Sequence, residues 1–210
     1  MTQATAPSAR TKLRRHPERG HYDFDTLAAI IDDAWVCHVS FTLDGAVHAM
    51  PTAHWRVGDY LYIHGARASR MLKALTDSDA CVTLAQVDGL VLARSAFHHS
   101  MNFRSVVAYG RFERVDDDAH KLDTMKAFID KVAPGRWASL RPVSDKELNA
   151  TTVLRLKLSE ASAKIRSGGV KDDEADLTWP VWAGVLPLAF TPGTPITESD
   201  SQVADFPPPG

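Results

Sequence analysis

The chain has 210 residues, of which 44% are hydrophobic and 24% are charged, and its formal net charge is -2. This composition is typical of a soluble domain with a buried core, and the near-neutral charge gives no electrostatic case for nucleic acid as a partner. No stretch approaches the roughly 20 apolar residues of a membrane span, and the first residues lack the apolar core of a secretory signal. We therefore expect a cytoplasmic protein with no membrane contact.

We predict three parts along the chain. Residues 1–20 are basic and contain two prolines, which indicates an extended arm. Residues 21–190 carry the periodic patterns and form one domain. Residues 191–210 are rich in proline, so we expect a disordered tail.

The first half of the domain predicts a helix followed by three strands. Asp23 gives a start signal for a helix that ends near Asp33. Strand-forming residues then fill 35–41, 46–57 and 60–64, and Asp44-Gly45 is a strong hairpin turn between the first two. Pro51 interrupts the second strand, which implies an edge strand or a bulge because proline removes a backbone donor.

The second half predicts three more strands and three helices. The strands cover 80–85, 103–115 and 151–158. One helix begins near Ser69, a second begins after the acidic run 116–118 and closes at Pro134-Gly135, and a capping box at Ser144 and Glu147 starts a short third. The sequence thus predicts a mainly β fold with flanking helices, a six-stranded antiparallel split barrel.

Two stretches have the residue types that bind phosphate. Ser69 and Arg70 fall in the first turn of a helix, where free N–H groups favour an anion and a lone cation opposes the helix dipole. Arg104 and Ser105 come directly before a buried strand and could present a guanidinium fork and a hydroxyl to an oxyanion. A plain surface turn and a solvated loop with a structural arginine are the respective alternatives.

The remaining candidates concern aromatic, histidine and cysteine side chains. Trp182 lies among prolines, so it either caps the barrel or stacks on a flat ligand. The nine histidines lack a close His-x-His pair, and we expect no metal site. His98 and His99 are the candidates for a catalytic proton donor, with a structural role as the alternative. The two cysteines lie in apolar runs and are expected to be core residues.

Several separate motifs resemble one family. They are Pro51-Thr52, HGARASRMLKAL from His64, DGLVLARSAFHHSMNFRSVVAYG from Asp88, ELNATTVLRL from Glu147, EASAKIRSG from Glu160 and PVWAGVLPL from Pro180. In this order they resemble the flavin-nucleotide-binding branch of the pyridoxamine 5′-phosphate oxidase-like superfamily, the FMN-binding split barrels.

The resemblance implies a homodimer with FMN in the clefts between subunits. Its cofactor-binding positions fall on three groups and two single residues. The phosphate would meet Ser69, Arg70 and Lys73, and a second phosphate and ribityl cluster would be Asn102, Arg104 and Ser105. The strand at Met50, Pro51 and Thr52 would meet the edge of the flavin ring, His64 would contact the ring or ribityl chain, and Trp182 would lie beside the flavin.

The resemblance also implies an oxidoreductase that passes electrons through FMN to or from a small molecule. Oxidation of pyridoxamine phosphate is not expected, because Val185-Leu186-Pro187-Leu188 and a proline-rich tail stand where those oxidases carry an arginine and histidine segment. The alternatives are a non-catalytic flavin or haem carrier and a metal-dependent barrel enzyme.

Overall fold

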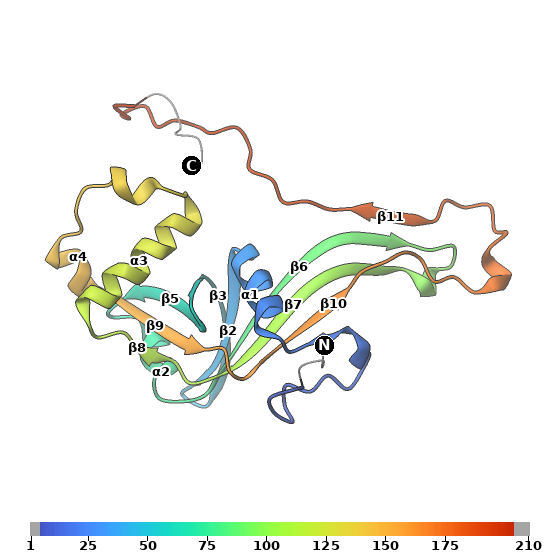
Figure 1. Cartoon of the computed structure of the whole chain (residues 1–210), viewed down its shortest axis with the longest axis horizontal. Coiled ribbons are helices and arrows are strands. Elements are labelled where there is room, and N and C mark those ends of the chain that lie inside the picture. The colour runs from blue at the N-terminus through green and yellow to red at the C-terminus, as the bar shows by residue number, and fades with distance from the viewer. Residues whose placement is uncertain (1–4, 204–210) are drawn as a thin grey trace.

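The computed structural model describes residues 5–203, which form two antiparallel sheets with helices at their margins. The first sheet has the order β1-β10-β7-β6-β2-β3, with β11 paired to the far part of β6, beyond the residues that pair with β2. Its strands are β1 (Gly20–His21), β10 (Ala161–Arg166), β7 (Ser100–Gly110), β6 (Ala80–Leu92), β2 (Val36–Leu43), β3 (Ala46–Ala53) and β11 (Gly184–Pro187). In Figure 1, β6, β7 and β10 extend from the helical end of the molecule to the side where β11 lies.

The second sheet has the order β4-β5-β9-β8. Its strands are β4 (Trp55–Val57), β5 (Tyr60–Ala66), β9 (Thr151–Lys157) and β8 (Glu113–Arg114). The mainly β split-barrel prediction is confirmed, although the described residues contain more strands than the six predicted. The predicted strand 46–57 is two strands in different sheets, because the chain turns at His54, which is 1% exposed.

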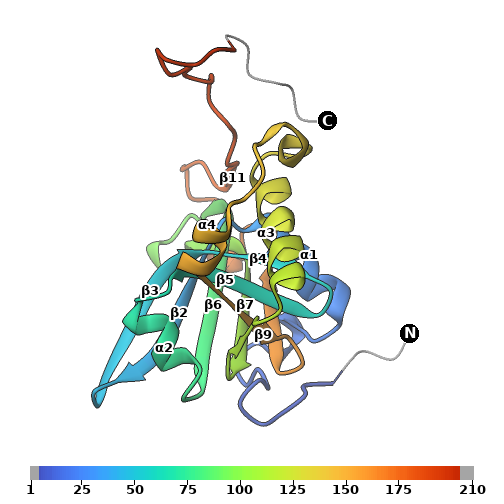
Figure 2. The same ribbon diagram turned by 90° about the vertical axis from the view of Figure 1, so that its left-hand side faces the viewer.

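The helices follow from their caps and apolar faces. They are α1 (Phe24–Asp33), α2 (Arg70–Leu75), α3 (Asp118–Val132) and α4 (Asp145–Ala150), with short 3-10 turns η1 (Pro17–Arg19), η2 (Ala96–His98), η3 (Arg136–Ser139) and η4 (Glu174–Asp176). Asp23 accepts from the Thr26 amide at 2.9 Å, and the predicted capping box joins Ser144 to Glu147. In Figure 2, β2 and β3 lie on one side of the molecule and α1 and α3 on the other.

The main core lies where α1 and α2 pack on the strands. Ile31, Leu75 and Leu154 are fully buried there. A smaller cluster around Trp55, Tyr62 and Val153 packs against α3. Cys37 is also fully buried, and burial raises the pKa of its thiol to about 12, as expected for an inert core residue.

The basic arm docks on the barrel from residue 5 onward. Arg10 forms ion pairs with Glu160 and with Asp79, Thr11 is buried, and β1 pairs with β10. In the predicted tail, residues 191–203 form no helix or strand, and residues 204–210 lie outside the described part of the chain. Among residues 5–203, no helix is long and apolar enough to cross a membrane.

Candidate functional site

Strand β3 forms one edge of the first sheet. In the described structure it pairs only with β2, in a register that places Pro51 opposite His38. Pro51 therefore lies on an edge strand, one of the two alternatives its position predicted. Met50 is 47% exposed and Thr52 is half-buried, so this edge presents side chains and backbone groups to whatever lies against it.

The start of α2 holds the first predicted phosphate group. The Ser69 hydroxyl caps the helix by accepting from the Leu72 amide at 3.4 Å. Arg70 pairs with Asp44 at 3.0 Å, but the two side chains are 76% and 77% exposed. An ion pair this exposed contributes little, so the Arg70 guanidinium is available to an anion. Lys73, one turn on, is exposed as well.

His64 on β5 is the half-buried histidine beside this group. Its ring packs against those of Trp55 and Phe128, with centroid distances of 5.6 and 5.0 Å. Burial lowers the pKa of His64, so the imidazole is neutral near neutral pH. Its Nδ1 is buried and has no hydrogen-bond partner among the described residues, which is uncommon for a buried polar atom and indicates a functional position.

Arg104 on β7 was predicted to bind a phosphate, but it pairs with two carboxylates of the protein. Its Nη2 donates to Asp88 at 2.8 Å and its Nη1 to Asp33 at 2.9 Å. Its hydrogen bonds to Asp88, with those to Asp33, raise the pKa of the guanidinium. Two carboxylates already neutralise this cation, which weighs against a phosphate at Arg104 in the single chain. Asp88 opens the same sequence motif as Arg104, whereas Asp33 comes from α1 and lies outside it.

The neighbours of Arg104 bond to the adjacent strand and loop. The Asn102 side chain donates to the Gly168 carbonyl at 3.1 Å and accepts from Arg166. The Ser105 hydroxyl donates to the Lys164 carbonyl at 3.3 Å. Asn102 is therefore joined to a basic side chain that the sequence analysis did not select.

The two predicted phosphate groups are not joined in the single chain. Leu75, the last residue of α2, accepts a hydrogen bond from the Phe112 amide, just past the end of β7. Arg104 lies near the middle of β7, where its ion pairs connect it to α1 and β6. Among residues 5–203, no hydrogen bond or ion pair connects Ser69, Arg70 or Lys73 to Asn102, Arg104 or Ser105.

The loop at 93–99 joins β6 to β7 and carries the two candidate proton donors. His98 Nε2 lies 3.2 Å from an Asp173 carboxylate oxygen, and His99 Nδ1 lies 2.9 Å from the Ser95 carbonyl. Arg94 donates to Asp172 at 2.8 Å and fixes the loop to the chain that follows β10. Both histidines lie far along the ladder from α2, and the sequence did not indicate the Arg94–Asp172 pair.

Trp182 lies on the surface at the start of β11. It is 64% exposed and does not belong to either buried core cluster of the described residues. A Cβ at Gly184 would come within 2.8 Å of the Trp182 ring, so glycine there makes room for the indole. In the single chain Trp182 does not cap the barrel, which leaves stacking on a ligand or a partner as its expected role.

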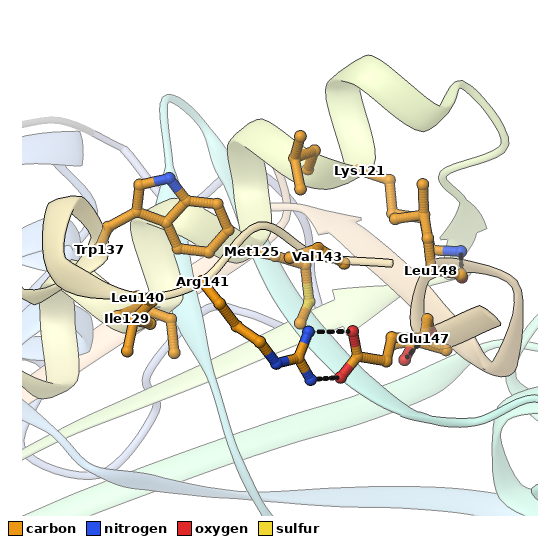
Figure 3. A pocket seen from close by; sticks show the side chains of 11 residues that line it. Lys121, Met125, Ile129, Trp137, Leu140, Arg141, Val143, Glu147 and Leu148 are labelled. Atoms are coloured by element: carbon orange, nitrogen blue, oxygen red, sulfur yellow. Dashed lines mark hydrogen bonds and ion pairs between the residues drawn. The ribbon is translucent and has the colours of Figure 1, made fainter. Parts of the chain in front are cut away.

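Several cavities adjoin these residues. One cavity of about 910 Å³ runs over β2, β6 and β7 and reaches Arg104 and Phe190. An apolar cavity of about 340 Å³ lies between α3, η3 and α4 (Figure 3), and the Arg141–Glu147 ion pair crosses its mouth. Basic residues line two more cavities near the loop at 93–99. Within residues 5–203 no three His, Cys, Asp or Glu side chains are arranged to hold a metal ion.

The two antiparallel sheets, the edge strand β3 and the short helix after β5 define the chain as a split barrel of the expected class. The sequence profile described as pyridoxamine 5′-phosphate oxidase matches residues 23–165. The chain therefore belongs to the pyridoxamine 5′-phosphate oxidase family. A search of curated proteins found no match.

Two solved structures are similar over nearly the whole chain. The flavocytochrome Anf3 from Azotobacter vinelandii is 41% identical, with 98% of this chain and 96% of that chain covered and a TM-score of 0.92. The FAD and haem binding protein from Mycobacterium smegmatis is 35% identical, with 90% and 94% covered and a TM-score of 0.85. The likeness to both includes the segments that follow residue 165, which the family profile does not reach.

Proposed function

We propose that this chain is an oxidoreductase that binds a flavin nucleotide and haem as a homodimer. The observation that carries the proposal is the 41% identity over 98% of the chain to a flavocytochrome. The second relative, named for FAD and haem binding, supports the same pair of cofactors. The sequence predicted FMN; because both relatives carry FAD or a flavin with haem in their names, we propose FAD as the nucleotide and keep FMN as an outcome of the test.

The residues around α2 fit a flavin nucleotide. The exposed side chains of Arg70 and Lys73 and the N–H groups beside Ser69 offer donors to a phosphate. The free edge of β3 at Met50, and the neighbouring Thr52, offers backbone groups to the rim of a flat ring. When bound, a flavin supplies one- or two-electron transfer, and these residues would hold and orient it.

We propose His64 as a ligand of the haem iron. Haem iron in proteins is commonly held by histidine, and the ligand must be neutral. The burial that lowers the His64 pKa keeps it neutral, and its unpartnered nitrogen has a lone pair or proton not yet used by the protein. Trp55 and Phe128 supply the apolar contact that keeps water from the ring. This proposal stands beside the prediction that His64 contacts the flavin.

A homodimer is supported by apolar side chains that the single chain leaves uncovered. Val47 is 81% exposed, Phe190 84% and Trp179 67%. Exposed large apolar groups on several elements indicate a surface that another protein covers. A second subunit would also bring cations of its own to the first phosphate group. Light scattering should give twice the mass of the chain, and a monomer with full flavin content would contradict the dimer.

The visible spectrum of the purified protein tests the cofactor proposal. We expect flavin bands together with a sharp haem band, and FAD in the supernatant after denaturation. The His64→Ala variant should lose the haem band and keep its flavin if His64 binds iron; loss of flavin instead would place His64 at the flavin. His38→Ala, on an exposed position of β2, is the matched control. A colourless protein that takes up neither cofactor would refute the proposed function.

A further inference from the structure

A cluster of basic side chains lines two adjacent cavities at the far end of β10. The cavities measure about 580 and 400 Å³ and share Arg19, Arg166 and Lys171. Arg15 and Lys164 also line the larger one. We call these five residues the basic basin. They come from the N-terminal arm, β10 and the loop after it, so the tertiary fold alone brings them together.

The charge of the basic basin is poorly balanced by the protein. Glu18 is the carboxylate that lines either cavity, and it lies 3.7 Å from Arg19 and 3.1 Å from His16. At the rim, Asp173 pairs with His98. Among residues 5–203, no ion pair is formed by Arg15, Lys164, Arg166 or Lys171. Five cations that converge on one concavity repel one another unless an anion enters.

Arg166 is the residue whose environment is hardest to explain without a ligand. It is 9% exposed, and its guanidinium donates only to neutral oxygens, those of Asn102 and Gly169. Burial lowers its pKa, and the positive charge of Arg19 lowers it further. A buried charge without an opposite charge is costly, and charged side chains are rarely buried unless paired. An aspartate or glutamate would normally pair with a buried arginine, but Arg166 faces the two cavities instead.

Aromatic rings at the same place indicate what else the ligand carries. Phe97 is 93% exposed and lines the larger cavity together with Phe103, His98 and His99. Exposed flat rings beside cations suit a nucleotide base attached to phosphates, because every base has a face that stacks. The cavity volumes fall in the usual range of about 300–1,000 Å³ for small-molecule sites.

We infer that the basic basin binds the adenosine diphosphate portion of a nucleotide, with the phosphates at Arg166 and the base at the rings of the loop 93–99. Two sources have this chemistry: the adenosine diphosphate end of FAD, or a separate adenine nucleotide. In the first case the inference rests on the proposed function and on the homodimer, because the two phosphates of FAD are adjacent and the basin of one subunit would have to meet the flavin site at α2 of the other. In the second case the inference does not depend on the proposed function.

Two matched arginine variants on the arm distinguish the effect of a cation inside the basin from the effect of the overall charge of the arm. Arg15→Gln removes a cation that lines the cavity, whereas Arg14→Gln removes its exposed neighbour, which lines neither cavity. Lys171→Gln is a second exposed basin variant, chosen because Arg166→Gln could disturb folding. Each lost charge-assisted contact should weaken binding about tenfold.

The readouts use the full-length protein as purified. Calorimetric affinities for FAD and for FMN are measured after cofactor exchange, and ADP is titrated into the flavin-loaded protein. If FAD is the source, Arg15→Gln and Lys171→Gln lower FAD affinity about tenfold and leave FMN affinity unchanged. If a separate nucleotide is the source, the flavin-loaded protein binds ADP and the same variants weaken that binding. Arg14→Gln should change neither.

Two results would overturn the inference. In the first, neither the preference for FAD over FMN nor the ADP affinity responds to the basin variants. In the second, Arg14→Gln has the same effect as Arg15→Gln, so that only the overall charge of the arm matters. If the protein shows the flavin and haem bands but the basin variants bind nucleotides as the wild type does, the proposed function holds and the basin inference is wrong. If the protein binds neither flavin nor haem but Arg15→Gln weakens its ADP binding, the basin inference holds and the proposed function is wrong.

Discussion

The two ends of the first sheet are built in different ways. At the end beside the helices, α1, α2 and the second sheet cover the strands, and Ile31, Leu75 and Leu154 are completely buried. At the other end, β6, β7, β10 and β11 extend beyond the helices (Figure 1), and Phe97, Met101 and Leu186 are exposed. The first end is a finished core, whereas the second presents side chains that only a ligand or another subunit could cover.

This difference separates stability from binding. Changes to the buried core at the helical end should affect the free energy of unfolding, because those side chains contact only each other. Changes to exposed side chains, at the extended end and around α2, should affect what the protein binds. The experiments below begin with the largest expected effect and test whether that division holds.

Ile31→Ala tests the helical end. Ile31 on α1 is 0% exposed, so its truncation should lower the free energy of unfolding by about 2–5 kcal/mol. Chemical denaturation measures the change. Val47→Ala, at an 81% exposed position, is the control and should change it by less than about 0.5 kcal/mol. Equal losses would show that β3 is covered as fully as α1, and would point to a partner on that strand.

The pH dependence of stability tests His54, which holds the turn between the two sheets. Its Nε2 lies 2.9 Å from the Ile31 carbonyl, and burial lowers its pKa to about 4. The unfolded chain binds a proton near pH 6.5, so the folded state loses stability as the pH falls from about 6.5 towards 4. The total loss should reach about 3 kcal/mol. Denaturation midpoints across this pH range measure it.

The His54→Gln variant supplies the contrast for that measurement. Without the imidazole, the part of the acid sensitivity that belongs to His54 should disappear, even though the variant starts from a lower stability. His38→Gln, at an exposed position on β2, should keep the slope of the wild type. A variant at His54 with an unchanged slope would assign the acid sensitivity to other groups.

Arg70 and Arg104 form the sharpest pair of arginines, because the first is exposed and the second pairs with two carboxylates. Arg70→Gln should weaken flavin binding about tenfold with no loss of stability, because its pair with Asp44 is exposed. Arg104→Gln should cost about 1 kcal/mol of stability, because its side chain is 33% exposed and pairs with two carboxylates. Calorimetry and denaturation distinguish them. Loss of flavin from the Arg104 variant alone would restore its predicted phosphate role.

The sequence by itself determined the features that depend on neighbouring residues. The Asp44-Gly45 hairpin turn occurs as predicted, with φ values of 52° and 76°, because few other residue pairs adopt that conformation. The helix caps at Asp23 and Ser144 were also predicted, since a cap involves residues only three positions apart. Pro51 left two alternatives, an edge strand or a bulge, and the pairing of the sheet decided for the edge. Several separate motifs, each local, were enough to indicate the family.

The tertiary structure alone decided the features that join distant segments. β11 pairs with β6 through a close approach at Gly89, and no pattern in residues 184–187 indicates that partner. Asp33 meets Arg104, 71 positions later, because α1 packs on β7. Arg166 is buried beside cations of an arm about 150 positions earlier. Such contacts depend on the path of the whole chain, so no local window of sequence can contain them.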